Sequence, residues 1–323
     1  MPNKIKKNYH CSLPPFERVD VVSMLEVSKQ AGWSITAFDL PKAWELSQGE
    51  GVVIAVLDTG CDLSHEDLIP NLLEGKNFVS PDTPPEDDCG HGTHVTGTLV
   101  AINNHNVVGI APKAKVRPVK VLNKKGDGNL KNVADAIRWC IDMKVDFISM
   151  SLGSPTPVQE VRKAIQAAAA KGIITFCAAG NAGNTKDVFY PAAYPETIAI
   201  GAIDESMKRA GFSNTGKNLD FMAPGVDILS TVPKNWYAKL SGTSMAQPFA
   251  CAVAALLLSY VRKHDTKIVL ETADDYRNMF KKYCTPVANG NYSDPAFYSG
   301  FGIIDPRKFI EAWGSGDPSY DKK

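Results

Sequence analysis

Short apolar runs alternate with amphipathic stretches along most of the chain. Runs rich in β-branched residues predict buried strands at 51–57, 115–122, 145–151, 173–178 and 197–203. Apolar residues at helical spacing predict helices between strands, at 131–143 and 157–171. This alternation predicts an α/β fold, with a mostly parallel central sheet, helices on both of its faces and right-handed crossovers.

The longest predicted helix covers residues 244–262. Pro248 falls in its first turns, where a missing backbone N–H is tolerated. Residues 250–258 are uninterrupted apolar, which is about half of the length that a membrane-spanning helix needs. We therefore expect a buried core helix and no membrane association.

The pattern divides the chain into three parts. Residues 1–25 form an N-terminal extension, residues 26–263 carry the strand and helix pattern of one domain, and residues 264–323 form a C-terminal extension. The C-terminal part contains predicted helices at 272–283 and 306–313, followed by a polar tail.

Charge and cysteine content narrow the class of protein. The 35 Lys and Arg residues balance 35 Asp and Glu residues, which argues against a nucleic-acid-binding protein. The seven cysteines are scattered and odd in number, so at least one is unpaired, as is typical of a reducing compartment. The N-terminus lacks the apolar stretch of a secretory signal, so the expected location is the cytoplasm.

Three polar motifs interrupt the apolar framework: D-T-G at 58–60, G-H-G-T-H at 90–94 and G-T-S-M-A at 242–246. Asp58 follows a predicted strand, at the sheet edge where α/β proteins place their ligands. Ser244 lies at the start of a helix, whose dipole favours a developing negative charge. Taken singly, the three motifs also fit a turn Asp, a structural His and a helix-capping Ser.

The combination is more specific than its parts. Ser is a weak nucleophile until a base removes its proton, and the base needs a carboxylate to orient it. The order Asp, His, Ser and the motifs D-T-G, G-H-G-T-H-V-x-G-T and S-G-T-S-M-A-x-P resemble those of subtilisin-like serine proteases. The resemblance runs from about residue 33 to about residue 261. It implies the three-layer subtilisin-like fold and hydrolysis of protein or peptide substrates through an acyl-enzyme.

The resemblance also implies roles for individual residues. Asp58 matches the orienting carboxylate, His91 the general base and acid, Ser244 the nucleophile, and Asn181 the side chain that donates to the oxyanion. The expected walls of the substrate cleft are Ser151, Leu152 and Gly153 on one side, Gly126, Asp127 and Gly128 on the other, and Ala178, Ala179 and Gly180 before Asn181. Leu130, Val133 and Leu152 match an apolar pocket for the fourth residue before the scissile bond.

Two positions depart from the family pattern near the first specificity pocket. Ala182 stands where many relatives have Glu, which removes a carboxylate from the pocket mouth. Phe189 falls near the pocket base, where Gly is common, and is expected to shorten the pocket.

Two cation sites are implied in the same way. Asp67 and the segment 102–107 resemble a calcium loop, with Asp67, Ile102, Asn104 and Val107 as ligands of Ca²⁺. A second, weaker cation site corresponds to the carbonyls of Ala192, Tyr194 and Thr197.

Several features resemble the intracellular branch of the family. Leu13, Pro14, Pro15 and Phe16 resemble a Leu-Ile-Pro-Tyr motif of intracellular members, which implies an N-terminal inhibitory segment and a latent form of the enzyme. Family resemblance also implies a homodimer through the C-terminal extension. Cys61 and Cys89 lie close in sequence to Asp58 and His91, so inhibition by thiol reagents is a further hypothesis.

Two other functions stay open from the sequence. The first is a catalytically silent subtilase fold that serves as a regulatory or binding module, although decay usually removes at least one of the four catalytic positions. The second is a doubly wound nucleotide-binding protein, but the chain lacks G-x-G-x-x-G after its first strand.

Overall fold

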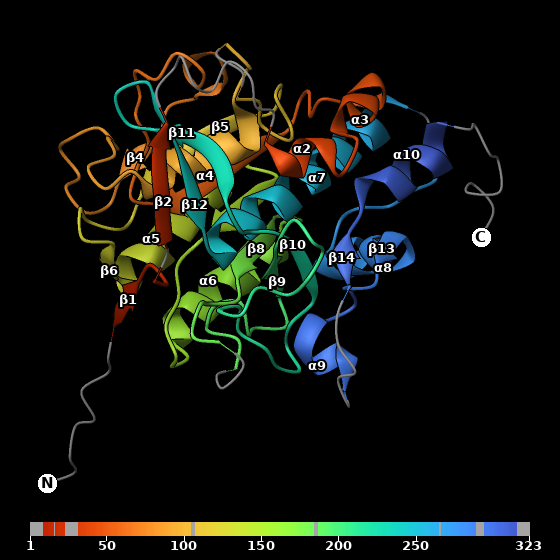
Figure 1. Cartoon of the computed structure of the whole chain (residues 1–323). Coiled ribbons are helices and arrows are strands. Elements are labelled where there is room, and N and C mark those ends of the chain that lie inside the picture. The colour runs from red at the N-terminus through yellow and green to blue at the C-terminus, as the bar shows by residue number, and fades with distance from the viewer. Residues whose placement is uncertain are drawn as a thin grey trace, which may run out of the picture.

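The computed structural model in Figure 1 describes residues 9–15, 17–22, 32–104, 107–183, 187–264, 266–288 and 294–314, with the backbone alone for 17–22. Its centre is a nine-stranded sheet in the order β13-β14-β10-β9-β8-β7-β3-β5-β4. The strands are β3 (Val53–Asp58), β4 (Lys76–Asn77), β5 (Lys115–Lys120), β7 (Phe147–Met150), β8 (Ile174–Ala178), β9 (Thr197–Ile203), β10 (Phe221–Pro224), β13 (Cys284–Thr285) and β14 (Ile303–Ile304).

The sheet is mostly parallel, as the sequence predicts. Each pair from β14 to β4 is parallel, and β13 alone runs antiparallel to its neighbour β14. The central strands are buried on both faces, which explains their continuous apolar runs. The strand predicted near an edge, β5, is next to the edge strand β4.

Helices cover both faces of the sheet, which confirms the predicted fold class. The helices α4 (His91–Val100) and α7 (Thr243–Lys263) pack together, and α5 (Leu130–Asp142) packs on α6 (Gln159–Ala169). The short elements α2 (Trp33–Thr36), α3 (Leu40–Leu46) and a 3₁₀ turn at Ile69–Asn71 lie in the N-terminal half.

Helix α7 is the longest of the described helices, with 21 residues. By length and composition it could cross a membrane, and no other helix of the described residues is both long and apolar enough to do so. Its apolar window is 89% buried within the fold, where it contacts β7, β8, β9 and β10. Packing inside a soluble core accounts for this composition equally well.

Two small antiparallel sheets flank the main one. In the first, β1 (His10–Ser12) pairs with β6 (Asp127–Asn129). In the second, β12 (Trp236–Ser241) lies between β11 (Ile228–Val232) and β2 (Glu17–Val22). Both sheets therefore join the N-terminal extension to the rest of the chain (Figure 1).

The C-terminal segment is part of the same core. Its elements are α8 (Ala273–Tyr283), β13, α9 (Pro295–Ser299), β14 and α10 (Pro306–Gly314). Tyr276 of α8 is buried and packs edge-on against Phe147 and Phe176 of the central strands. The hydrophobic core thus continues across the division predicted at residue 263.

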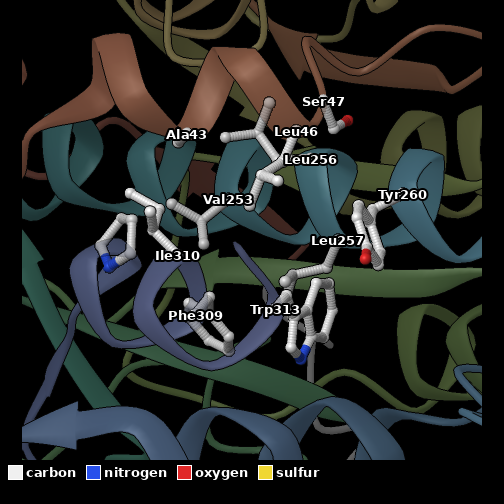
Figure 2. A pocket seen from close by; sticks show the side chains of 11 residues that line it. Ala43, Leu46, Ser47, Val253, Leu256, Leu257, Tyr260, Phe309, Ile310 and Trp313 are labelled. Atoms are coloured by element: carbon white, nitrogen blue, oxygen red, sulfur yellow. The ribbon is translucent and has the colours of Figure 1, made fainter. Parts of the chain in front are cut away.

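Figure 2 shows how α10 closes over the domain. Phe309, Ile310 and Trp313 lie against Val253 and other apolar residues of α7, below α3. The Trp313 ring stacks on Tyr260 with a centroid distance of 4.7 Å. A cavity of about 30 Å³ is left between the three helices.

Candidate active site

Asp58 and His91 meet at the carboxyl end of the central strand β3. Asp58 is the last residue of β3, and His91 is the first residue of α4. Both side chains are buried, and Nδ1 of His91 lies 2.8 Å from Oδ1 of Asp58. An ionised carboxylate can only accept, so Nδ1 carries the proton and Nε2 of the neutral ring is the basic nitrogen. Thr59 N–H donates to the same Oδ1 at 2.7 Å.

The chain around His91 approaches β3 very closely. A Cβ atom on Gly92 would stand 2.1 Å from the carbonyl oxygen of Gly60 and 3.2 Å from Oδ1 of Asp58. No side chain fits at this position, which is the physical reason for the second Gly of the G-H-G motif.

Asp87 holds the loop that precedes His91. Its Oδ1 accepts hydrogen bonds from the Thr59 hydroxyl and from the N–H groups of Cys89 and Gly90. Its Oδ2 accepts from both the N–H and the hydroxyl of Thr93. These five bonds join the D-T-G turn to the start of α4, so Asp87 positions the Asp58–His91 pair.

Two residues of the site, Asp87 and Lys120, are not among those predicted from the sequence. The Nζ of buried Lys120 donates to the Thr59 carbonyl at 2.5 Å and to Oδ1 of Asp88 at 2.6 Å. The acid-rich stretch 80–90 reads as a loop, and Lys120 reads as a strand end. A Lys at the buried end of a strand, which is rarely left unpaired, is the signal that could have found this contact.

Ser244 lies in the first turn of α7 and is buried. Its hydroxyl donates to the Ser151 carbonyl at 3.4 Å, and its own carbonyl accepts from the Ser151 hydroxyl at 3.1 Å. The helix start therefore lies directly against the segment 151–153, one of the two expected walls of the cleft.

Asn181 faces the N-terminal extension. Its Oδ1 accepts from the N–H and the hydroxyl of Thr243, at 2.9 and 2.7 Å, which leaves Nδ2 to point the other way. Nδ2 donates to the carbonyl oxygen of Pro15 at 2.6 Å. A backbone carbonyl of the chain itself therefore lies against the side chain expected to stabilise an oxyanion.

The two expected cleft walls enclose the same extension. On one side, β1 pairs with β6, with Cys11 opposite Gly128 and Ser12 opposite Asp127. The N–H of Leu13 continues this edge by donating to the Gly126 carbonyl at 2.9 Å. On the other side, Ser12 and Gly153 exchange two backbone hydrogen bonds, of 3.3 and 3.0 Å.

The remaining residues of the predicted cleft lie in the same region. Cys11 is buried, as are Leu130, Val133 and Leu152, the residues expected to form the apolar pocket. Ala178 ends β8, and Ala179 and Gly180 lead from it to Asn181. Of the predicted inhibitory motif, Leu13, Pro14 and Pro15 are in place against this cleft, whereas Phe16 lies outside the described residues.

Phe189 lies between the two sides of the expected specificity pocket. Its Cβ would be 3.3 Å from a Cβ placed on Gly153, and its Cδ2 3.1 Å from a Cβ placed on Gly180. Its N–H donates to the Ala179 carbonyl at 3.0 Å, which anchors the residue to that wall. The half-buried ring therefore occupies space between the walls.

The thiol hypothesis concerns Cys89, which lines a cavity of about 710 Å³ together with His91. Burial raises the pKa of the half-buried Cys89 thiol to about 11. The reactive thiolate is therefore scarce near neutral pH, and the hypothesis loses support.

Asp67 is fully buried and lies beside Ile102 and Asn104. Its Oδ1 accepts from the Asn104 N–H and its Oδ2 from the Tyr237 hydroxyl, both at 2.5 Å. Burial raises the pKa of Tyr237, so this hydroxyl keeps its proton. The Ile102 N–H donates to the Asp67 carbonyl at 3.1 Å. The structure thus brings Asp67 next to Ile102 and Asn104, and Val107 closes the same loop.

This donor set fits Ca²⁺. A buried carboxylate is costly unless it is paired with a cation, and in the described structure the partners of the Asp67 carboxylate are neutral donors. Each carboxylate oxygen keeps a second lone pair for a metal ion. The described residues hold no group of three His, Cys, Asp or Glu side chains placed to bind one metal ion, so the other ligands would be carbonyl and amide oxygens.

The second implied cation site does not fit a metal ion. The carbonyls of Ala192 and Tyr194 lie within hydrogen-bond distance of the Thr197 hydroxyl, at 3.1 and 2.9 Å. The Thr197 carbonyl accepts from Nη2 of Arg277, a residue of α8 whose Nε lies 2.9 Å from Oδ1 of Asp220. A guanidinium therefore supplies the positive charge at this place.

Comparison with known proteins places the chain in one family. The model of the Subtilase family matches residues 49–302. An intracellular serine protease of Paenibacillus polymyxa is 46% identical over 226 residues, 67% of this chain and 69% of that protein. The major intracellular serine protease of Bacillus subtilis is 43% identical over 237 residues, 70% and 74% of the two chains.

The chain is also similar to subtilisins that are not named as intracellular proteases. Subtilisin E of Bacillus subtilis is 42% identical over 262 residues, which is 80% of this chain and 65% of that protein. The family match covers most of the chain and includes all three motif segments. The chain therefore belongs to the subtilase family and is a subtilisin-like serine protease.

Proposed function

We propose that Asp58, His91 and Ser244 form the catalytic triad of an endopeptidase that cleaves intracellular proteins, with Asn181 as an oxyanion donor. The buried 2.8 Å contact between Asp58 and Nδ1 of His91 is the observation that carries this proposal. It selects the His tautomer whose Nε2 can accept a proton, and it stabilises the imidazolium that forms.

In this mechanism Nε2 of His91 takes the Ser244 hydroxyl proton as the oxygen attacks the scissile carbonyl carbon. The carbonyl oxygen becomes negative and accepts from Nδ2 of Asn181, which Thr243 holds in the donating orientation. His91 then returns the proton to the leaving amine, and water hydrolyses the acyl-enzyme by the same steps. The start of α7 adds its dipole to the stabilisation of this negative charge.

Ser244→Ala is expected to lower kcat/KM by several orders of magnitude, as triad deletions do in subtilisin, the reference case for this size of effect. The measurement is hydrolysis of a small peptide after removal of the N-terminal extension. Thermal unfolding should change little, because Ser244 contributes one weak hydrogen bond of 3.4 Å through its hydroxyl. Ser206→Ala, at an exposed turn, is the control. Activity within tenfold of wild type in Ser244→Ala would exclude the triad.

The N-terminal extension, in our proposal, keeps the enzyme latent. The support is its course: Ser12 and Leu13 pair with both cleft walls, and Pro15 contacts Asn181. Residues 17–22 then continue along β12 on the far side of the site. An inhibitor tethered in this way acts at high effective concentration, so modest contacts suffice to exclude substrate.

Pro14 explains why such a segment resists cleavage. Counting two residues along the antiparallel pair of Ser12 and Gly153 places Pro14 opposite Ser151. Pro14 has no N–H to donate to the Ser151 carbonyl, which accepts the Ser244 hydroxyl instead. This pairing brings Pro14 next to Ser244. Asn181, however, contacts the carbonyl oxygen of the following residue, Pro15. This offset of one residue places the carbonyl wrongly for attack.

A protein that begins near Val22 is expected to be active at once, whereas the full-length protein shows a lag that ends with N-terminal processing. Pro14→Ala restores the missing N–H, so this variant should lose its lag through faster self-cleavage. The exposed Pro70 provides the control variant Pro70→Ala. Peptide hydrolysis followed from the moment of purification measures the lag, and equal initial rates for full-length and shortened protein would contradict latency.

We further propose that Phe189 restricts the residue before the scissile bond to small side chains. The residue whose carbonyl meets Asn181 lies between the walls 151–153 and 178–180, where the Phe189 ring already stands. A large side chain there would have to displace the ring or leave its own surface in water.

Phe189→Gly is therefore expected to raise kcat/KM for peptides with Phe or Leu at this position, by at least about tenfold relative to Ala peptides. Phe78→Gly, next to the edge strand β4, is the matched control. The proposal fails if the wild-type enzyme already cleaves after Phe as efficiently as after Ala.

Calcium binding at Asp67 is also a proposal, with Asp67, Ile102, Asn104 and Val107 as the residues that would hold the ion. A ligand that binds only the folded state stabilises it by about 2.7 kcal/mol at a hundredfold excess over its dissociation constant. A chelator should therefore lower the Tm of wild type and of the surface variant Asp135→Ala, but leave that of Asp67→Ala unchanged. Equal chelator effects in all three proteins would exclude this site.

We propose the cytoplasm as the location. All seven cysteines are free, five of them buried, as is typical of a reducing compartment. Two relatives named as intracellular serine proteases support the same conclusion. The homodimer through the C-terminal extension, and the expectation of no nucleic-acid or membrane partner, stay predictions.

A further inference from the structure

Strand β12 starts a second interaction surface beside the nucleophile. Its last residue, Ser241, precedes Ser244 by only three positions. One edge of β12 pairs with β11, from Trp236 opposite Val232 to Leu240 opposite Ile228. The other edge pairs with β2, the part of the N-terminal extension that follows Pro15.

Removal of the N-terminal extension would leave this edge of β12 unpaired. Residues 17–22 occupy it through five paired positions, from Ser241 opposite Glu17 to Tyr237 opposite Val22. Once they leave, β12 presents a row of backbone N–H and C=O groups without strand partners. Such an edge is a ready template for another extended chain. In an active peptidase, the extended chain that arrives there is the substrate.

The surroundings of β12 fit a bound polypeptide. A cavity of about 710 Å³ lies between the loop 87–91 and this sheet, and it reaches from His91 to Leu240 and Trp236. Trp236 is 55% exposed, so a large aromatic surface is available beside the edge. Aromatic side chains of this kind contribute strongly to peptide binding because they bury a large area with little loss of side-chain freedom.

The charges along this edge of β12 indicate a preference for an acidic side chain in the bound chain. Lys239 of β12 is half-buried and is the register partner of Asp20. Lys234 adds a second positive charge on the cavity wall. The acidic residues of the same wall are already engaged, because Asp88 pairs with Lys120 and Asp87 accepts the five bonds of the His91 loop. Opposite charges on facing positions of two strands attract.

We propose that β12, from Trp236 to Ser241, is an extended docking site for the substrate residues that follow the scissile bond, with Lys239 selecting an acidic side chain. The inference rests on the proposed peptidase function and on release of the extension. Asp20 is the fifth residue after Pro15, whose carbonyl meets Asn181. This count includes Val19, which the register shift between Lys239 and Leu240 leaves without a partner, so a chain with the same shift has its acidic residue at the fifth position after the cleaved bond. Backbone pairing supplies affinity, and Lys239 and Trp236 supply selectivity.

The test uses protein that begins near Val22 and peptides identical up to the scissile bond. One peptide has two residues after this bond, and the others have seven, with Asp or Lys at the fifth position. The longer Asp peptide should have a kcat/KM at least about tenfold higher than the short peptide, mainly through a lower KM. The Asp peptide should exceed the Lys peptide several-fold in wild type, and this order should reverse in Lys239→Glu. Lys163→Glu, at an exposed position of α6, is the matched control.

A binding measurement separates docking from catalysis. The shortened Ser244→Ala protein should bind a free peptide of sequence E-R-V-D-V-V, the sequence of residues 17–22, with a change in Trp236 fluorescence. N-methylation of alternate residues in that peptide should weaken binding, because it removes backbone donors. Cleavage of the short peptide tests the catalytic assignment by itself. Equal kcat/KM for short and long peptides, or a preference unaffected by Lys239→Glu, would overturn the docking site.

Discussion

The buried contact between Asp58 and His91 is the constraint on which the site depends. It exists because β3 ends as an interior strand of the sheet and α4 begins at His91, with no side chain on Gly92 to keep the two apart. Asp87 and Lys120 fasten the adjoining turns through buried, charge-assisted hydrogen bonds. These bonds are strong where water is excluded, so the geometry is set before substrate arrives.

The N-terminal extension is held by strand pairing, which is also the mode of binding that we propose for substrate. It adds one strand to β6 upstream of the site and one to β12 downstream, so backbone hydrogen bonds hold it on both sides. Recognition by backbone pairing does not distinguish inhibitor from substrate. The difference lies at Pro14 and Pro15, where a missing donor and a shifted carbonyl disturb the alignment. The proposed inhibition and the proposed substrate binding therefore follow from one mode of strand addition.

The C-terminal segment stabilises the sheet that carries the site. β14 extends the sheet beside β10, and Tyr276 fills the space against Phe147 and Phe176. Arg277 of the same helix binds Asp220 and the Thr197 carbonyl, so a guanidinium neutralises a region where the family resemblance implies a metal ion. A fixed side-chain charge needs no ion from solution. The segment is thus a structural part of the domain as well as its chain end.

The sequence alone indicated the α/β class, the main strands and helices, and the four positions proposed as catalytic, because these depend on local periodicity and on short motifs of defined residue types. It also indicated the Leu13–Phe16 segment and Phe189 by resemblance. Only the tertiary structure brought Asp87, Lys120 and Arg277 to their partners, since each bond joins residues that are not neighbours in sequence. The pairing of residues 17–22 with β12 is likewise absent from any local pattern. Strand partners are chosen by which edges remain free after the core has packed, and that is a property of the folded whole.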